Sequence, residues 1–420
     1  MNTFMTIAAI LGLTALFSYI NERFLHLQQS IGLMALALVL TLALMFLSTT
    51  GLIDPLLWEQ TFVTHLSLDE TLLNGVLCFM LFAGSLNVKS SLLGEQKWII
   101  LSLAIGATLI AAVLVGLTVF WLSGLAGLGL GLFFSLVFGA LISPTDPIAT
   151  LAILGKIGLP PKLETIINGE SLFNDGVAVV IFTVFLAIAI GTREPTLADA
   201  ATLFLREVAG GVGLGILAAA VIHHMLVRST DYGTQVLISL AVVSLAYGLA
   251  EQIEVSGPIA MVVAGLVVGN YSLPRMSTEQ CTRFEIFWRA IDEILNAMLF
   301  VIIGLHIAIV PEDTGLQFTA LTAVVICLVA RWISVFLPVS ALMLVGLLKA
   351  DRFGLSNLLT WGGLRGGLAI AMALSLPAGP EKALILQMTY GVVAFSIIVQ
   401  GLTIQRLFST DRLQRLLVDG

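Results

Sequence analysis

The most constraining feature of this 420-residue sequence is a series of apolar runs, each about as long as a membrane is thick. A helix needs about 20 apolar residues to cross a bilayer, and thirteen such runs follow one another with short connections. The composition agrees, because 58% of the residues are hydrophobic and only 11% are charged, against about 25% charged in soluble proteins. We therefore predict an all-α integral membrane protein. The runs are centred near Leu11, Leu38, Phe79, Leu109, Phe134, Val179, Leu214, Leu240, Val263, Phe300, Val329, Ala369 and Val393.

The basic residues predict how these runs are oriented across the membrane. If the N-terminus lies outside, fourteen of the 19 lysines and arginines fall in inner segments, and only Arg193 and Lys382 fall in outer ones. Cytoplasmic loops of membrane proteins carry the excess of basic residues. We therefore expect an outer N-terminus and a cytoplasmic C-terminus in a plasma membrane of the bacterial inner-membrane type. Residues 1–420 are expected to form one transmembrane domain without a soluble regulatory domain.

Two of the runs carry residues that break helices. The segment "SPTDP" places prolines on both sides of Asp146, and "WGGLRGG" surrounds Arg365 with four glycines. Broken helices at membrane depth are tolerated where they line a polar cavity, and paired breaks in two halves of a transporter point to its binding site. The breaks fall in the fifth and twelfth runs. This spacing predicts two discontinuous, crossing helices within inverted six-helix repeats over about 1–191 and 233–408, with the seventh helix as linker.

The sixth run begins with a group of polar side chains. In "NGESLFNDGVAVV", Ser171 and Asp175 are four residues apart and share one helix face, while Glu170 and Asn174 share the neighbouring face. A charged residue at the centre of a membrane helix costs about 2.5–3.5 kcal/mol on insertion scales, so its presence indicates an ion or proton path. Small hard cations prefer oxygen ligands. A metal site at Asp175, Ser171 and Thr145, in which one carboxylate is joined by neutral oxygens from Ser171, Asn174 and the unwound carbonyls near Thr145, would therefore suit sodium or lithium.

For the other charged residues in these runs, a structural role is the alternative to a functional one. Glu170 is expected to form a buried ion pair with Arg365, because a carboxylate and a guanidinium can bind each other through two hydrogen bonds. Asp146 could ligate a cation, or it could bind unpaired amides of the half-helix after the break, and the second role is favoured. Arg331 has no partner that the sequence identifies. An internal ion pair is the default expectation for it.

At "SPTDP", "NGESLFNDGVAVV" and "WGGLRGGLA", in that order, the sequence resembles the sodium/proton antiporters of the cation/proton antiporter superfamily. The resemblance is to the monovalent cation:proton antiporter-1 branch, which carries an Asn-Asp pair, and "FWRAIDEILNAMLFVIIGL" is also similar to that branch. It implies a homodimer in which a substrate-binding core moves against a dimerisation domain. It also implies that Asp175 binds the cation and the proton, with Asn174, Ser171, Thr145 and Asp146 around it.

One position departs from the pattern of that branch. In the third run many relatives have an acidic residue where this sequence, in "LFAGSLN", has Ala83. Any coordination through that carboxylate is absent here. The departure therefore bears on the ligand set and on the choice between sodium and potassium.

These features together predict a secondary active antiporter that exchanges sodium or lithium for protons, electroneutrally and by alternating access, for pH and sodium homeostasis. A potassium/proton exchanger on the same scaffold is the alternative. Rivals of other classes are a channel, which would not couple cation flux to protons, and an intramembrane enzyme, for which the sequence has no HExxH or GxSxG motif. The expected partners are monovalent cations, protons, the lipid bilayer and a second copy of the chain. We expect no cofactor and no nucleic acid.

Overall fold

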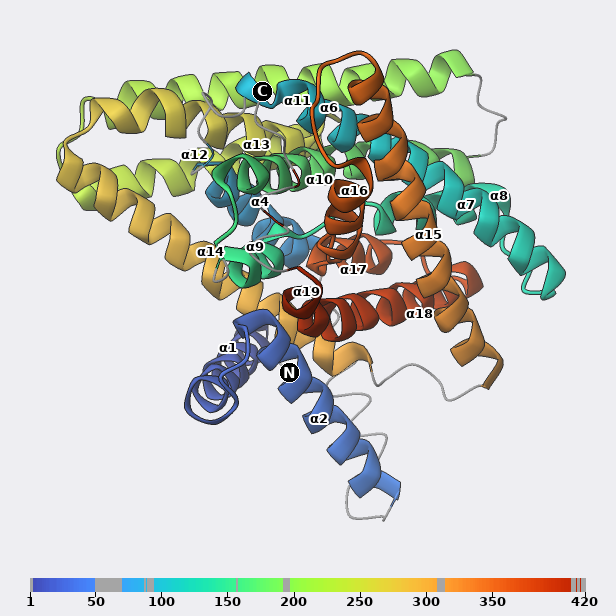
Figure 1. The fold of residues 1–420 in the computed structure, drawn as a ribbon. Helices are drawn as coiled ribbons and strands as arrows, with labels where there is room; N and C mark the ends of the chain where they lie inside the picture. Colours follow the sequence, from blue (N-terminus) through green and yellow to red (C-terminus); the bar gives the residue numbers. More distant parts are fainter. Residues whose placement is uncertain are drawn as a thin grey trace.

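The fold is given by a computed structural model that describes residues 3–49, 70–86, 88, 94–155, 158–191, 197–307, 314–408, 413 and 416. Within these ranges the regular elements are helices, and β-structure is limited to one isolated bridge. Figure 1 shows the helices packed against one another in a bundle. The prediction of an all-α protein is confirmed. Arg193, one of the two basic residues predicted to lie outside, falls outside the described ranges.

Each of the thirteen predicted centres lies inside a helix of the described chain. The first half of the chain forms α1 (Thr3–Ile20), α2 (Gln29–Thr49), α4 (Glu70–Leu86), α6 (Lys97–Leu101), α7 (Thr108–Leu125), α8 (Leu132–Ile142), α9 (Pro147–Gly155), α10 (Pro161–Ile190) and α11 (Leu197–Leu226). The second half forms α12 (Tyr232–Gln252), α13 (Gly257–Val267), α14 (Thr278–Ile307), α15 (Thr314–Leu344), α16 (Arg352–Trp361), α17 (Gly367–Leu374), α18 (Pro380–Phe395) and α19 (Gly401–Leu407).

Several of these helices are long and apolar enough to cross a membrane. By length and composition, seven helical segments of the described chain qualify, or eight if α1 and α2, which meet at a bend of 108°, count as one span. The chain is therefore a multi-pass membrane protein. The exact count of thirteen spans stays a prediction, because the broken and shorter helices do not meet that criterion singly.

Two of the helices are interrupted, as the prolines and glycines indicate. Residues 143–146 separate α8 from α9, and residues 362–366 separate α16 from α17. The two breaks meet each other, because the backbone amide of Asp146 donates a hydrogen bond of 2.7 Å to the carbonyl of Leu364. The prediction of two discontinuous helices is confirmed, and they cross at their breaks.

Two large hydrophobic cores hold the described part of the bundle together, beside a small cluster of Ile10, Met298 and Ile302. The larger core contains buried side chains of α8, α10, α15 and α16 to α18, among them Phe138 and Leu359. The second core contains side chains of α4, α11, α12, α13 and the first half of α14, together with Leu172 of α10. In this core the ring centroids of Phe82 and Trp288 lie 4.7 Å apart. In Figure 1, α12, α13 and α14 gather on the left, and α7, α15 and α18 on the right. The molecule thus has two packed units that can face each other across a cavity.

Helices α7 and α8 pack with close backbone contact because glycines lie at their interface. A Cβ atom on Gly139 would lie 2.0 Å from the carbonyl oxygen of Ala112, and one on Gly116 would lie 2.8 Å from the Cα atom of Leu136. Small residues at the interface of membrane helices allow such close approach. The contact fixes α8 in position directly before its break.

We predict that Gly139→Ala lowers the stability of the protein, because a methyl group at this position must push the α7 backbone away. Overpacking of this kind costs about 1–3 kcal/mol. Gly124→Ala in α7 is the matched control, since a Cβ atom there meets no other atom within 4 Å. Thermal unfolding in detergent measures the effect. Equal melting temperatures of the two variants would contradict the proposed packing constraint.

Candidate functional site

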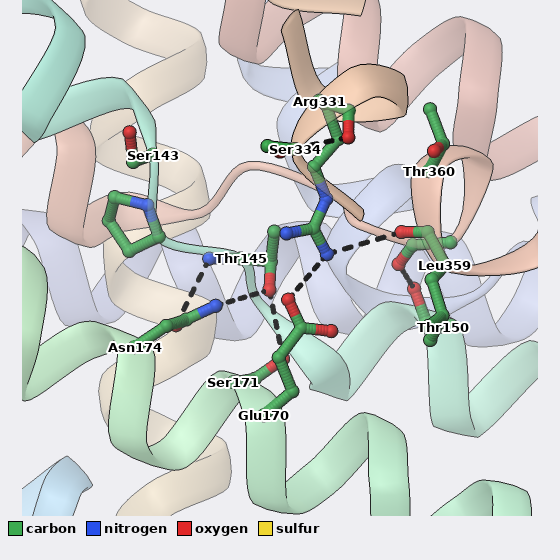
Figure 2. Close-up of polar contacts among 12 residues, drawn as sticks. Ser143, Thr145, Thr150, Glu170, Ser171, Asn174, Arg331, Ser334, Leu359 and Thr360 are labelled. Carbon is green, nitrogen blue, oxygen red and sulfur yellow. Dashed lines mark hydrogen bonds and ion pairs between the residues drawn. The ribbon is translucent and has the colours of Figure 1, made fainter. Parts of the chain in front are cut away.

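A buried network of polar side chains joins the break between α8 and α9 to α10. The hydroxyl oxygen of Thr145 lies 3.0 Å from that of Ser171, and it accepts a hydrogen bond of 2.9 Å from Nδ2 of Asn174. The backbone amide of Thr145 in turn donates to Oδ1 of Asn174 at 3.4 Å. All three residues are buried. Figure 2 shows these side chains meeting between the break and α10, so the network fixes the position of the break relative to α10.

A cavity of about 250 Å³ opens beside this network. Thr145, Asp146, Ser171 and Asp175 contribute to its wall, whereas Glu170 does not. Ser171 and Asp175 therefore face the same space, as their spacing of four residues indicates. Within the part of the chain that the structure describes, the carboxylate of Asp175 makes no hydrogen bond and no ion pair, so its oxygens are available to a ligand in the cavity.

The cavity lies between the two hydrophobic cores. Helices α9, α10 and α17 line one part of it, and α4 and α14 line the other part. Ala83 on α4 faces this cavity and is buried, so the methyl group noted in the sequence stands at the cavity wall. The wall thus combines hydroxyl groups, carboxylates and apolar surface.

Asp146 lies where the two broken helices cross. Its backbone bonds to Leu364, and its carboxylate lies against Gly366, at which a Cβ atom would be 2.8 Å from Oδ2 of Asp146. Gly366 is the residue that precedes the first turn of α17. The start of a helix carries a partial positive charge, which favours a nearby carboxylate. The sequence did not indicate this neighbour, and the favoured role of Asp146 at the start of α9 stays a prediction.

The predicted partner of Glu170 was wrong. Glu170 forms its ion pair with Arg331 of α15, with Oε1 and Nη2 2.6 Å apart and both side chains only 2% exposed. The same Nη2 also donates to the carbonyl oxygen of Leu359 at 3.2 Å. Arg331 therefore has the internal ion pair expected for it, and Figure 2 shows its guanidinium between Glu170 and the end of α16.

Arg365 does not pair with Glu170. It forms hydrogen bonds with the backbone at the break between α8 and α9. Its Nη1 donates hydrogen bonds to the carbonyl oxygens of Ser143 and Pro144, the second at 2.9 Å. The prolines of this segment interrupt the helical hydrogen-bond pattern and leave carbonyl groups without an amide donor. A guanidinium supplies several donors in a fixed geometry. These carbonyl groups without an amide donor explain why the guanidinium of Arg365 binds at the break and not to Glu170.

Residues with no role predicted from the sequence complete the crossing and the cavity. Thr150 of α9 donates to the carbonyl oxygen of Gly362 at 2.5 Å, and Ser396 accepts a hydrogen bond of 2.9 Å from the backbone amide of Arg365. On α14, Asp292 and Asn296 line the cavity. The contacts of Thr150 and Ser396 left no local signal in the sequence. Asp292 did leave one, because it is a carboxylate shortly before an apolar run.

The donor groups at the cavity fit a small monovalent cation better than a transition metal. Among the described residues, no group of three or more His, Cys, Asp and Glu side chains could hold a metal ion. The expected set of Asp175, Ser171 and Thr145 instead combines one carboxylate with two neutral hydroxyl oxygens. Hard monovalent cations take such oxygen ligands.

Comparison with known proteins agrees with this arrangement. The sequence pattern of the family described as "Sodium/hydrogen exchanger, transmembrane" matches residues 4–410. The chain belongs to this family. It is 41% identical over 402 residues to the Na(+)/H(+) antiporter NhaP of Pseudomonas aeruginosa, with 95% of this chain and 94% of the relative covered. It is 35% identical over 346 residues to the Na(+)/H(+) antiporter NhaH of Halobacillus dabanensis, with 81% and 82% covered.

A solved structure shows the same fold. The sodium proton antiporter MjNhaP1 of Methanocaldococcus jannaschii matches with a TM-score of 0.76 and 19% sequence identity over the whole of both chains. Membership of the sodium/hydrogen exchanger family confirms the resemblance inferred from the sequence motifs. It also confirms that the chain is a transporter rather than an enzyme.

We predict that loss of either member of the buried pair destabilises the protein strongly. Arg331→Met leaves Glu170 buried without a counter-charge, which costs about 3–5 kcal/mol. The double variant Glu170→Gln with Arg331→Met should recover part of this loss, because neither charge remains. Thermal unfolding of the single and double variants in detergent measures the coupling.

An exposed pair of similar length provides the matched control. Glu279 and Arg283 of α14 lie 2.5 Å apart, but their side chains are 73% and 58% exposed. Exposed ion pairs contribute about 0–1 kcal/mol. Glu279→Gln should therefore leave the melting temperature nearly unchanged. If Arg331→Met behaved like Glu279→Gln, the assignment of Arg331 as the partner of Glu170 would be overturned.

Proposed function

We propose that this protein is a secondary active antiporter that exchanges sodium or lithium for protons across a membrane. The observation that carries the proposal is the carboxylate of Asp175, which lines a cavity between two packed units and has no protein partner within the described residues. The sodium/proton exchange named for the relatives supports the same activity. A carboxylate in this position can bind a cation or a proton from the cavity.

Exchange follows from competition for this one carboxylate. When Asp175 is ionised, its oxygens attract a cation, and the hydroxyl groups of Ser171 and Thr145 add neutral oxygen ligands nearby. When Asp175 is protonated, the negative charge is gone and the cation is released. Asn174 positions Thr145 through its amide. Asp146 at the crossing lines the same cavity.

Alternating access would require one unit to move against the other. The larger hydrophobic core includes α10 and both broken helices, so the cation site would travel with this unit. The second core, built from α4, α11 to α13 and the first half of α14, would form the stationary unit and the contact of a homodimer. The cavity between them is where such movement would open and close a path.

The finer architecture is part of the proposal. We expect about thirteen spans in one domain over residues 1–420, with inverted repeats over about 1–191 and 233–408 and α11 as linker. The meeting of the two breaks at Asp146 and Leu364 supports this symmetry. We also expect a plasma membrane location with the N-terminus outside and the C-terminus in the cytoplasm, because the basic residues concentrate on the inner side.

We predict that Asp175→Asn abolishes exchange and leaves a folded protein. The amide cannot release a proton, and it carries no charge to attract the cation. Purified protein in liposomes containing a pH-sensitive dye should respond to sodium or lithium in the parent and not in the variant. Glu164→Gln is the matched control, because Glu164 lies on the same helix, is exposed and does not line the cavity. Substantial sodium-driven proton flux in Asp175→Asn would refute the proposed role.

The same assay separates the rival functions. Potassium should drive little proton flux if the protein is a sodium or lithium exchanger, whereas a potassium/proton exchanger should respond most strongly to potassium. A channel would conduct cations without moving protons. Lowering the pH should raise the apparent KM for the cation, because protons and cations compete for Asp175. A KM that does not change with pH would contradict this competition.

We predict that the exchange is electroneutral, one monovalent cation for one proton. Asn174 occupies the position beside Asp175 with an amide that does not titrate, so Asp175 is the carboxylate that cycles. Asp146 would change the count if it also exchanged a proton, but we propose that it stays charged beside the start of α17. The sodium gradient that balances a given proton gradient should therefore not depend on voltage.

Voltage clamping of liposomes with potassium and valinomycin tests this stoichiometry. Moving one net elementary charge is worth about 2.3 kcal/mol per 100 mV. An exchange with unequal charges would therefore shift its balance point visibly with voltage, in opposite directions for the two signs of the potential. Such a shift would show that the stoichiometry is not one to one.

A further inference from the structure

The part of the cavity wall that belongs to the second hydrophobic core contains one carboxylate. Helix α4 contributes only uncharged residues to this wall, namely Val76, Leu77, Met80, Leu81, Ala83 and Gly84. Helix α14 contributes Arg289, Asp292, Asn296 and Leu299, which lie on one face of that helix. Asp292 thus faces the same cavity as Asp175, but from the other packed unit.

The burial of these residues places Asp292 partway along the path into the cavity. Arg289 is exposed, Asp292 is half-buried, and Asn296 is buried with 7% of its surface exposed. A cation that enters along α14 would therefore pass Asp292 before it reaches the inner part of the wall. The three positions follow the helix in order, so depth increases steadily from the first to the last.

The carboxylate of Asp292 is held in place by Asn296 and forms no ion pair with any described residue. Nδ2 of Asn296 donates a hydrogen bond of 3.0 Å to Oδ1 of Asp292 and another of 3.0 Å to its carbonyl oxygen. No cationic side chain of the described residues forms an ion pair with Asp292, although Arg289 lies one turn earlier on the same helix. The carboxyl group of Asp292 therefore lines the cavity, and no cationic side chain of the described residues is paired with it.

We propose that Asp292 determines the affinity for the transported cation by attracting it into the cavity. The proposal rests on the proposed exchange function. A cavity of about 250 Å³ has room for several water molecules, so a cation at this depth keeps part of its hydration shell. Asp292 then acts on it through charge, and Asp175 binds it at the crossing. Because the affinity for the cation depends on the charge, the exact length of the side chain at position 292 has little effect on it.

The test compares variants that change the charge and variants that keep it. Asp292→Asn removes the charge but retains an oxygen that can accept the hydrogen bond from Asn296, so the local structure is preserved. We expect the KM for sodium and lithium to rise about tenfold, the effect of one unit charge at roughly 8 Å and an effective dielectric constant of about 30. The maximal rate should stay within about twofold. Asp292→Glu should behave like the parent protein.

A neighbouring carboxylate serves as the matched control. Glu293 is exposed, follows Asp292 directly in the sequence and does not line the cavity. Glu293→Gln removes the same charge from the same helix turn, and it should leave the KM unchanged. Binding is read independently from the lithium-dependent rise of the melting temperature in detergent. The lithium concentration that gives half of this rise should increase about tenfold in Asp292→Asn, which does not require transport.

The outcomes distinguish this inference from the proposed function. If the parent protein shows no cation-driven proton flux, the exchange function itself fails. If the parent exchanges and Asp292→Asn has an unchanged KM, only the role of Asp292 is overturned. A lost maximal rate at an unchanged KM would also overturn it, because it would place Asp292 in the transport step. If Asp292→Asn does not fold, Asp292→Ser supplies the same comparison of KM with the parent.

Discussion

The structure depends on how the backbone is satisfied where two helices break inside a membrane. Water is scarce there, so each carbonyl and amide freed by a break needs a partner from the protein. Arg365 supplies donors to the carbonyl groups of Ser143 and Pro144, and Thr150 supplies one to Gly362. The freed carbonyl groups at each break thus accept hydrogen bonds from residues at or next to the other break. The crossing is therefore a single unit, and the polar groups left over can face the cavity.

The same constraint separates structural charges from the charge available for exchange. A buried charge is tolerated when it is paired or fully hydrogen-bonded. Glu170 meets this condition through Arg331, and Arg365 meets it through backbone carbonyl groups. Asp175 does not meet it within the described residues, and it lies at a cavity. A carboxylate in that position requires a proton or a cation from solution. Because the other buried charges are already paired or hydrogen-bonded, Asp175 is the group available for the proposed exchange.

The sequence predicts features that depend on neighbours along the chain, and it fails for those that depend on packing. The helix centres and both breaks follow from local apolar runs, prolines and glycines, and the structure confirms them. The partner of Glu170 could not be identified in this way. Arg331 and Arg365 both lie in apolar runs far along the chain, and only the packing of α15 against the larger core decides which of them reaches Glu170. Asp292 is visible in the sequence as a carboxylate before an apolar run, but only the packing of α14 shows that it lines the cavity.

Helix geometry explains how α10 can be both anchored and reactive. Glu170 and Asp175 are five residues apart, which places them about 140° apart around a helix with 3.6 residues per turn. One side of α10 can therefore be fixed to α15 through Arg331, while another side presents Asp175 to the cavity. Ser171 lies one turn before Asp175 on the cavity face and also contacts Thr145 at the break. Any movement of α10 relative to α4 and α14 would carry the ion pair, the crossing and the exchanging carboxylate together. Access to Asp175 can therefore change while the contacts that hold α10 at Glu170 and Ser171 stay the same.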